Sequence, residues 1–202
     1  RMMAGPPAGD LDGEGYPAII VCTLGGDNYS IGYDGSIQSG FPFESTKRFN
    51  APATLVDLDG DSDLEIVAGN DDGLLHVLHH DGTEMASYEV GDDIRGGISV
   101  ADLNDDGSYE LLFTGYDDMI HVWNPIDGEE LEGWPVDMES NALTEPVTAD
   151  LDNDGDLEVV TARKSGMAYV FHHDATLYNN FPASLGGNVE SSPAIGDMDG
   201  DG

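Results

Sequence analysis

One acidic motif recurs through the chain at a nearly constant interval. It reads DLDGEGYPAIIV at 10–21, DLDGDSDLEIV at 57–67, DLNDDGSYELL at 102–112 and DLDNDGDLEVV at 150–160, and DMDGDG closes the sequence at 197–202. The first aspartates of the copies lie at positions 10, 57, 102, 150 and 197, which gives spacings of 47, 45, 48 and 47 residues. A period of this length is typical of repeat architectures, and the blades of β-propellers have it.

The segments around each motif also repeat in a fixed order. A short segment with Pro or Gly precedes the motif, and a β-rich run such as EIVAG or ELLFTG follows it. A turn, an alternating segment and a hairpin signal such as Asp34-Gly35 or Asp81-Gly82 come next, and a short segment with an aromatic residue ends the unit. No segment shows a sustained helical period. We therefore predict an all-β chain, a β-propeller of four-stranded antiparallel blades.

The predicted propeller forms a single region over residues 1–202. The sequence accounts for four blades and the first strand of a fifth, so we interpret it as part of a longer propeller. The expected blades span 1–48, 49–93, 94–141 and 142–188, with the start of a fifth at 189–202. The single cysteine, Cys22, lies in an apolar run and is expected to be a small core residue.

The charge of the chain restricts its partners. Six Lys and Arg residues stand against 41 Asp and Glu residues, so the formal net charge is −35. Such a chain is repelled by nucleic acid phosphates and by anionic membrane surfaces, whereas a cation is attracted. No apolar stretch approaches the ~20 residues that a membrane helix needs. We expect no nucleic acid partner and no membrane insertion.

The spacing of oxygen-bearing side chains in the motif suits a hard cation. Counted from the first Asp, positions 1, 3 and 5 carry side-chain oxygens, position 6 is usually Gly and position 9 is usually Glu. Calcium takes six to eight oxygen ligands in irregular geometry, whereas magnesium demands a stricter octahedron. Zinc would require Cys or His, and the loops carry neither. The pattern predicts one Ca²⁺ per loop, and the alternative is a solvated acidic turn.

An EF-hand uses a similar start but differs in two respects. It needs Glu at position 12 and flanking helices. In the three copies that have Glu at position 9, position 12 is Ala68, Phe113 or Thr161, and the flanking segments are predicted strands. The sequence therefore argues against an EF-hand.

The stretch DLDGDSDLEIVAG and its copies resemble the calcium-binding loops of FG-GAP/VCBS repeats. This propeller type occurs in integrin alpha chains and in many secreted bacterial proteins, and the present copies are closer to the bacterial ones. The resemblance covers the whole chain. It implies that calcium lies in the hairpin between the first and second strands of a blade, and that the opposite face or the rim meets partners. The motif is specific for the fold and says little about function.

Carried over residue by residue, the resemblance implies three full sites. Their ligands are Asp57, Asp59, Asp61 and Glu65 with the carbonyl of Asp63; Asp102, Asn104, Asp106 and Glu110 with the carbonyl of Ser108; and Asp150, Asp152, Asp154 and Glu158 with the carbonyl of Asp156. The first loop offers Asp10, Asp12 and Glu14 but has Ala18 at position 9, so its site should be weaker or empty. The fifth loop offers Asp197, Asp199 and Asp201, and the sequence ends before its position 9.

The histidines and the aromatic residues also follow the repeat. Because the six histidines occupy matching positions, we expect structural or surface roles for them. The aromatic residues Phe41, Tyr88, Trp134 and Phe181 stand at equivalent positions, which favours packing between blades. No Ser-His-Asp order, phosphate loop or carboxylate pair outside the loops indicates a catalytic site.

The sequence therefore favours a calcium-binding repeat scaffold without enzymatic activity, secreted or at the cell surface. It would mediate adhesion by binding a protein or a glycan. Extracellular calcium modules often bind at about 10⁻⁴–10⁻³ M, which suits this location. Two alternatives stay open: the propeller part of a secreted enzyme, such as a peptidase or polysaccharide lyase, and a self-associating structural subunit of a surface filament.

Overall fold

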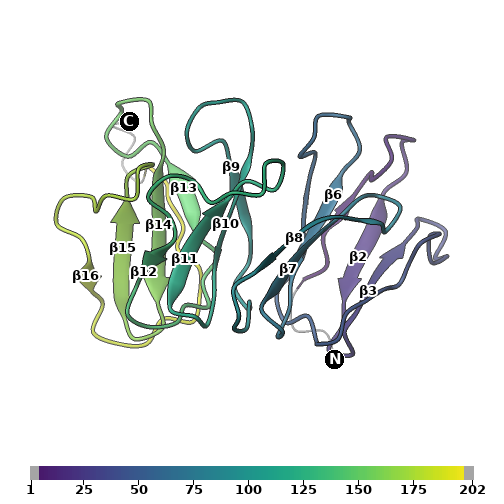
Figure 1. The fold of residues 1–202 in the computed structure, drawn as a ribbon, viewed down its shortest axis with the longest axis horizontal. Helices are drawn as coiled ribbons and strands as arrows, with labels where there is room; N and C mark the ends of the chain where they lie inside the picture. Colours follow the sequence, from purple (N-terminus) through teal and green to yellow (C-terminus); the bar gives the residue numbers. More distant parts are fainter. Residues whose placement is uncertain (1–4, 198–202) are drawn as a thin grey trace.

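A computed structural model describes residues 5–197, and all of the regular structure in that range is β-sheet. Sixteen strands form four antiparallel sheets of four strands each, and every sheet keeps its strands in chain order. Figure 1 shows the four sheets fanned side by side, with the first and the fourth at opposite ends of the row. The predicted all-β propeller of four-stranded blades is confirmed.

The first two blades use the eight N-terminal strands. Blade 1 consists of β1 (Ala8–Gly9), β2 (Ala18–Cys22), β3 (Asp27–Ile31) and β4 (Phe43–Glu44). Blade 2 consists of β5 (Thr54–Val56), β6 (Glu65–Gly69), β7 (Leu74–Leu78) and β8 (Glu84–Glu89). The acidic loop joins the first strand to the second in both blades.

The last two blades repeat this order. Blade 3 consists of β9 (Ser99–Ala101), β10 (Glu110–Thr114), β11 (Met119–Trp123) and β12 (Val136–Asp137). Blade 4 consists of β13 (Val147–Ala149), β14 (Glu158–Arg163), β15 (Met167–Phe171) and β16 (Ala183–Ser184). The register also repeats, since Ile66 faces Leu78 as Leu111 faces Trp123 and Val159 faces Phe171.

The core lies between consecutive blades rather than within a closed sandwich. Alternate residues of a strand point to opposite faces, so Ile66 and Leu78 pack toward blade 1 while Val67 and Val77 pack toward blade 3. Because each inner blade is covered on both faces, β6 and β10 are buried along their whole length. The described residues form one apolar cluster at each of the three blade junctions and none between blades 4 and 1.

Three of the four aromatic residues at matching positions, Phe41, Tyr88 and Trp134, pack between blades as predicted, whereas Phe181 contacts Tyr178 of its own blade. Trp134 of blade 3 lies edge-on to Phe171 of blade 4, with ring centroids 5.6 Å apart, and its Nε1 donates to the His173 carbonyl. Tyr88 of blade 2 contacts the rings of Phe113 and Trp123 in blade 3. These contacts set the spacing of the blades along the chain.

The residues after blade 4 continue the same series of contacts. The Thr54 hydroxyl donates to the Ile98 carbonyl and the Ser99 hydroxyl to the Pro146 carbonyl, which links the first strands of neighbouring blades. The Glu145 amide donates to the Ser192 hydroxyl at 2.9 Å. Residues 189–197 thus lie beside the start of blade 4, and no strand is assigned to them, so the fifth blade expected at 189–202 stays a prediction.

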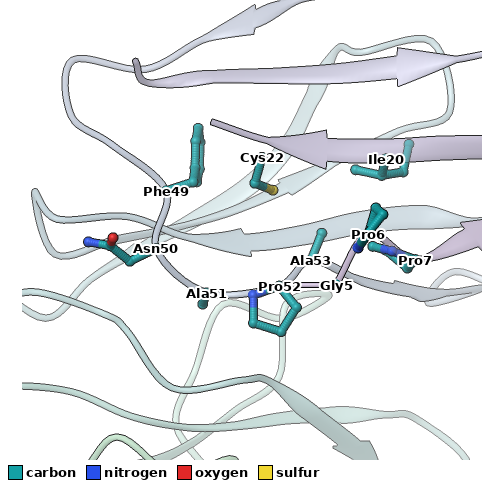
Figure 2. Close-up of a pocket in the computed structure, with 10 residues that line it drawn as sticks. All are labelled: Gly5, Pro6, Pro7, Ile20, Cys22, Phe49, Asn50, Ala51, Pro52 and Ala53. Carbon is teal, nitrogen blue, oxygen red and sulfur yellow. The ribbon is translucent and has the colours of Figure 1, made fainter. Parts of the chain in front are cut away.

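A small, partly open cavity lies between blades 1 and 2, away from the acidic loops. Its volume of 10 Å³ suits about one water molecule. In Figure 2 the Cys22 side chain lies between those of Phe49 and Ile20. Burial raises the pKa of the Cys22 thiol to about 12, so it stays protonated. The side chain is partly buried and packs against the core cluster of blades 1 and 2, at the edge of the core in which its sequence context places it.

Candidate metal centre

Each acidic loop curls around the carboxylate that opens it. The amide at position 6 donates to the Asp at position 1 in all four blades: Gly15 to Asp10 at 2.8 Å, Ser62 to Asp57 at 3.1 Å, Gly107 to Asp102 at 2.9 Å and Gly155 to Asp150 at 3.1 Å. The bend needs left-handed backbone at positions 4 and 6, which explains Gly60 and Gly155. Local turns thus place the alternate side chains of positions 1, 3 and 5 on the inside.

The carboxylates at these positions converge. One oxygen each from Asp57, Asp59 and Asp61 lies within 4.8 Å of the others, and the same holds for Asp150, Asp152 and Asp154. In blade 3, Asn104 replaces one aspartate, and its amide nitrogen donates to Asp106 at 2.8 Å. Like charges at about 4 Å repel by about 1 kcal/mol in water and more near a protein surface.

The glutamate at position 9 is fully buried in blades 2, 3 and 4, where it begins the second strand. Its Oε2 accepts the amide of the leucine at position 2: Leu58 to Glu65 at 2.9 Å, Leu103 to Glu110 at 2.9 Å and Leu151 to Glu158 at 2.7 Å. Burial raises the pKa of Glu65 and of Glu110, because desolvation disfavours the anion more than this hydrogen bond favours it. A nearby cation would remove that penalty.

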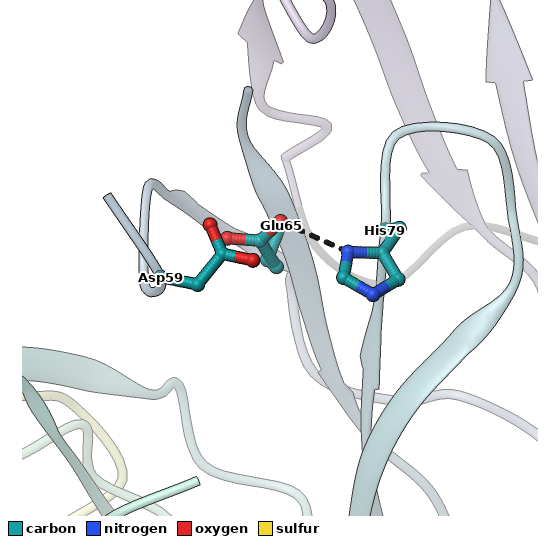
Figure 3. A group of neighbouring side chains, drawn as sticks. All are labelled: Asp59, Glu65 and His79. Carbon is teal, nitrogen blue, oxygen red and sulfur yellow. Dashed lines mark hydrogen bonds and ion pairs between the residues drawn. The ribbon is translucent and has the colours of Figure 1, made fainter. Parts of the chain in front are cut away.

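The residue that follows the third strand also contacts the position-9 glutamate. In Figure 3, Glu65 lies between Asp59 of the loop and His79, whose Nδ1 is 3.4 Å from Glu65 Oε1. His172 repeats this contact with Glu158 at 3.1 Å. In blade 3 the contact comes from Asn124, whose Nδ2 lies 3.3 Å from Glu110 Oε1. Loop, second strand and third strand therefore meet at one buried carboxylate.

In two blades, the second residue after the third strand contacts the loop residue at position 7. His80 Nδ1 lies 2.9 Å from Asp63 Oδ2, and His173 Nδ1 lies 3.3 Å from Asp156 Oδ2. Both contacts use side chains, so the position-7 carbonyl stays available as a metal ligand. The pattern is confined to blades 2 and 4, because blade 3 has Ser108 and Pro125 at these positions.

No lysine or arginine among residues 5–197 lies close enough to the acidic loops to neutralise their negative charge. The five that the range contains lie at the opposite end of the blades, in or beside the turns after the second strand or the connections to the next blade: Lys47, Arg48, Arg95, Arg163 and Lys164. Arg48 and Arg95 there both pair with Asp71. The converging carboxylates therefore fit a bound cation with oxygen ligands.

A scan of protein families provides the decisive comparison. The model described as an FG-GAP-like repeat matches residues 102–161 and 150–202, which together are half of the chain. The chain belongs to the FG-GAP-like repeat family. Among curated proteins, none matches it.

Solved structures share the fold of this FG-GAP-like chain at low sequence identity. The Vibrio cholerae biofilm matrix protein Bap1 aligns with a TM-score of 0.68 at 21% identity, over 91% of this chain and 29% of the Bap1 chain. The computationally designed Ika4 protein aligns at 0.59 and 16% identity, over 85% and 91% of the two chains. BamB from Moraxella catarrhalis aligns at 0.52 and 15% identity, over 88% and 61%. The chain thus spans less than a third of the Bap1 chain.

The first and fifth FG-GAP-like loops differ from the three full ones. In loop 1, Ala18 replaces the buried glutamate, yet Asp10 keeps a buried Oδ1 that has no hydrogen-bond partner. That oxygen fits a cation too, and a weaker site there stays a prediction. In the fifth loop Asp197 is exposed, whereas Asp199 and Asp201 lie outside the described residues.

The residues that contact the loops from the end of the third strand were not identified from the sequence. Structural or surface roles were expected for His79, His80, His172 and His173, without a connection to the acidic motifs. The FG-GAP-like repeats contain a signal for the connection, since loops with Asp at position 7 are those whose third strand is followed by His-His. Two loops therefore have a histidine nitrogen beside them, although neither loop contains a histidine.

Proposed function

We propose that the chain is a calcium-binding repeat scaffold of a secreted or cell-surface protein, and that it mediates adhesion by binding a protein or a glycan. The observation that carries the proposal is the repeated convergence of loop carboxylates beside a buried Glu65, Glu110 or Glu158. All of the candidate ligands in these three sets are oxygens. Calcium suits them better than magnesium, because the loops offer many oxygens in an irregular arrangement.

Calcium would act on the fold through the second strand of each blade. An ion held by positions 1, 3 and 5 would also attract the carboxylate at position 9, which is the first residue of β6, β10 and β14. Binding to the folded state alone stabilises it by mass action. The ion would thereby fix the acidic loop to the strand that carries the core residues.

Three observations support an extracellular binding role. The chain belongs to the FG-GAP-like repeat family, its fold is shared with a protein described as a biofilm matrix protein, and its composition is strongly acidic. Within residues 5–197 no helix has the length and apolarity of a membrane crossing. The acidic surface disfavours nucleic acid as the partner.

The test is a thermal melt of the chelator-stripped chain, titrated separately with calcium and with magnesium at equal ionic strength. We expect a rise in melting temperature that is selective for calcium, and isothermal titration calorimetry should count at least three ions. The triple variant Asp57→Asn, Asp102→Asn and Asp150→Asn tests whether calcium binds at the acidic loops, because it removes the first carboxylate of each full loop. An equal rise with both salts, or an unchanged calcium response in the triple variant, would contradict the proposal.

A further inference from the structure

Blade 1 breaks the repeat at one end of its acidic loop. Where blades 2 and 4 carry the pairs Asp63–His80 and Asp156–His173, blade 1 carries Tyr16 and Tyr33 at the equivalent positions. The two tyrosine rings stack, with centroids 4.4 Å apart and planes inclined by 22°. A histidine–aspartate contact in two blades is thus replaced by an aromatic pair in this one.

The stack is exposed and would remain so inside a longer propeller. Tyr16 and Tyr33 are 58% and 67% exposed. The equivalent side chains of blade 2, Asp63 and His80, keep 26% and 38% exposure although blades flank them on both sides. The position therefore opens to solvent even where neighbouring blades are present. Two large apolar rings held together in such a place indicate a binding surface more than a packing role.

A hollow of 180 Å³ adjoins the rings and has a polar rim. Asp34 accepts hydrogen bonds from both the amide and the hydroxyl of Ser36, which hold its carboxylate in place and lower its pKa. Gln38 also lines the hollow, and the Ser30 hydroxyl donates to its Oε1, so the Gln38 amide nitrogen remains available as a donor. Acceptors and a donor thus stand beside an aromatic face.

The geometry of the two rings selects among ligand classes. Aromatic cages for organic cations surround the charge with several ring faces, whereas the outer faces of a stacked pair are flat and point away from each other. A flat face suits a ring-shaped ligand, and polar groups around it suit hydroxyls. Nucleotides and acidic sugars carry negative charge and are repelled by a chain of net charge −35.

We propose that the Tyr16–Tyr33 stack, with Asp34, Ser36 and Gln38, binds one ring of a neutral carbohydrate. The inference deepens the proposed binding role and rests on it, because it names the ligand class and the site. The apolar face of the sugar lies on the exposed tyrosine face, and its hydroxyls bond to the rim. Asp12 and Glu14, which also line the hollow, remain available to a cation in loop 1.

The test is a screen of the whole chain, with calcium present, against an array of neutral oligosaccharides that includes glucan, mannan and galactan fragments. Alginate and a trimethyl-lysine peptide are the anionic and cationic comparisons. The test variant is the double change Tyr16→Asp and Tyr33→His, which rebuilds the pair found in blades 2 and 4. Tyr109→Ala, at an exposed tyrosine of the blade 3 loop, is the matched control.

We expect a neutral glycan to bind, and the double variant to lose about tenfold or more of its affinity, the effect of an interface hot spot. Tyr109→Ala should bind as the wild type does. Absence of any neutral glycan ligand, equal affinity in the double variant, or binding of only the peptide or only alginate would overturn the inference. The calcium melt of the same samples is read separately, so failure of the sugar site is distinguishable from failure of the calcium scaffold.

Discussion

The backbone amide of Leu58 donates to Glu65 Oε2 at 2.9 Å and so joins the second residue of the acidic loop to the first residue of β6. The same hydrogen bond recurs between Leu103 and Glu110 in blade 3. The glutamate thereby has two roles, because one oxygen closes the loop while the other faces the third strand. Loop geometry and strand docking are coupled through this single side chain before any ion binds.

Replacing Glu110 by Gln should separate these two roles. The amide oxygen of Gln can still accept from the Leu103 amide, so the loop should keep its shape, but the anionic ligand is lost. We expect calorimetry to show one calcium ion fewer, or one site weakened about tenfold or more, since calcium affinity follows the charge of the ligand set. Without metal, the melting temperature should stay equal or rise, because a desolvated charge is removed.

The control for this variant is Glu132→Gln, at an exposed glutamate of blade 3 outside the loops. It removes the same charge and should leave the number of bound ions unchanged. Full calcium stoichiometry and affinity in Glu110→Gln would exclude Glu110 as a ligand.

Ser62 is the site of a second prediction, because it occupies position 6 with a φ of 81° where the other three described loops have glycine. A left-handed residue with a Cβ costs about 1–2 kcal/mol relative to glycine, partly offset by the greater entropy of unfolded glycine. Ser62→Gly should therefore raise the free energy of unfolding by about 1 kcal/mol in urea titrations. Ser108→Gly, at position 7, should lower it slightly. A loss of stability in Ser62→Gly would show that the serine side chain contributes more than the strain costs.

The period of the acidic motif was sufficient to predict blades, the number of strands and the position of the loops. Turn glycines, hairpin signals and apolar runs all recur at the same interval, so each copy supports the assignment of the others. The aromatic residue near the end of the first three units was also assigned correctly to blade packing, as the contact of Trp134 with Phe171 of the next blade shows. These features depend on local sequence and on spacing alone.

Contacts between strands of one blade could not be predicted in the same way. His79 follows Glu65 by fourteen residues, and the two meet because β6 and β7 pair in a register that places Ile66 opposite Leu78. A shift of one residue would turn the alternate side chains away. The Tyr16–Tyr33 stack depends on the same register in blade 1. Sequence spacing identifies such residues as repeat positions but does not pair them.

Gly69 tests the packing between blades 2 and 3. It ends β6, and a Cβ at this position would lie 2.8 Å from the Cβ of the fully buried Ile94. Gly69→Ala should lower the free energy of unfolding by about 1–3 kcal/mol, the cost of overpacking a tight core. Gly187→Ala is the control, because no heavy atom beyond the adjacent residues lies within 4 Å of its added methyl group. Equal free energies of unfolding for the two variants in urea titrations would show that the packing at this blade junction yields to the added methyl group at little cost.

His121 should make stability depend on pH away from the metal loops. It is 3% exposed, and its Nε2 and Nδ1 lie 2.9 Å from Asp117 Oδ2 and 2.8 Å from Glu130 Oε1. Burial alone would lower the pKa of His121, but the hydrogen bonds to Asp117 and Glu130 outweigh it and raise the pKa. Tyr88 donates to the same Glu130 oxygen at 2.7 Å.

A pKa that is higher in the folded state means that the folded chain holds the proton more tightly than the unfolded chain. The resulting stabilisation is fully present below the unfolded pKa of about 6.5 and is lost as the pH rises through the folded value. With calcium saturating, the wild type should therefore exceed His121→Gln in free energy of unfolding by more at pH 5.5 than at pH 9. Asp117→Asn removes one partner of the imidazolium and should narrow that difference. A gap between wild type and His121→Gln that stays constant with pH would mean that His121 contributes by packing against Phe113 and Tyr88 alone.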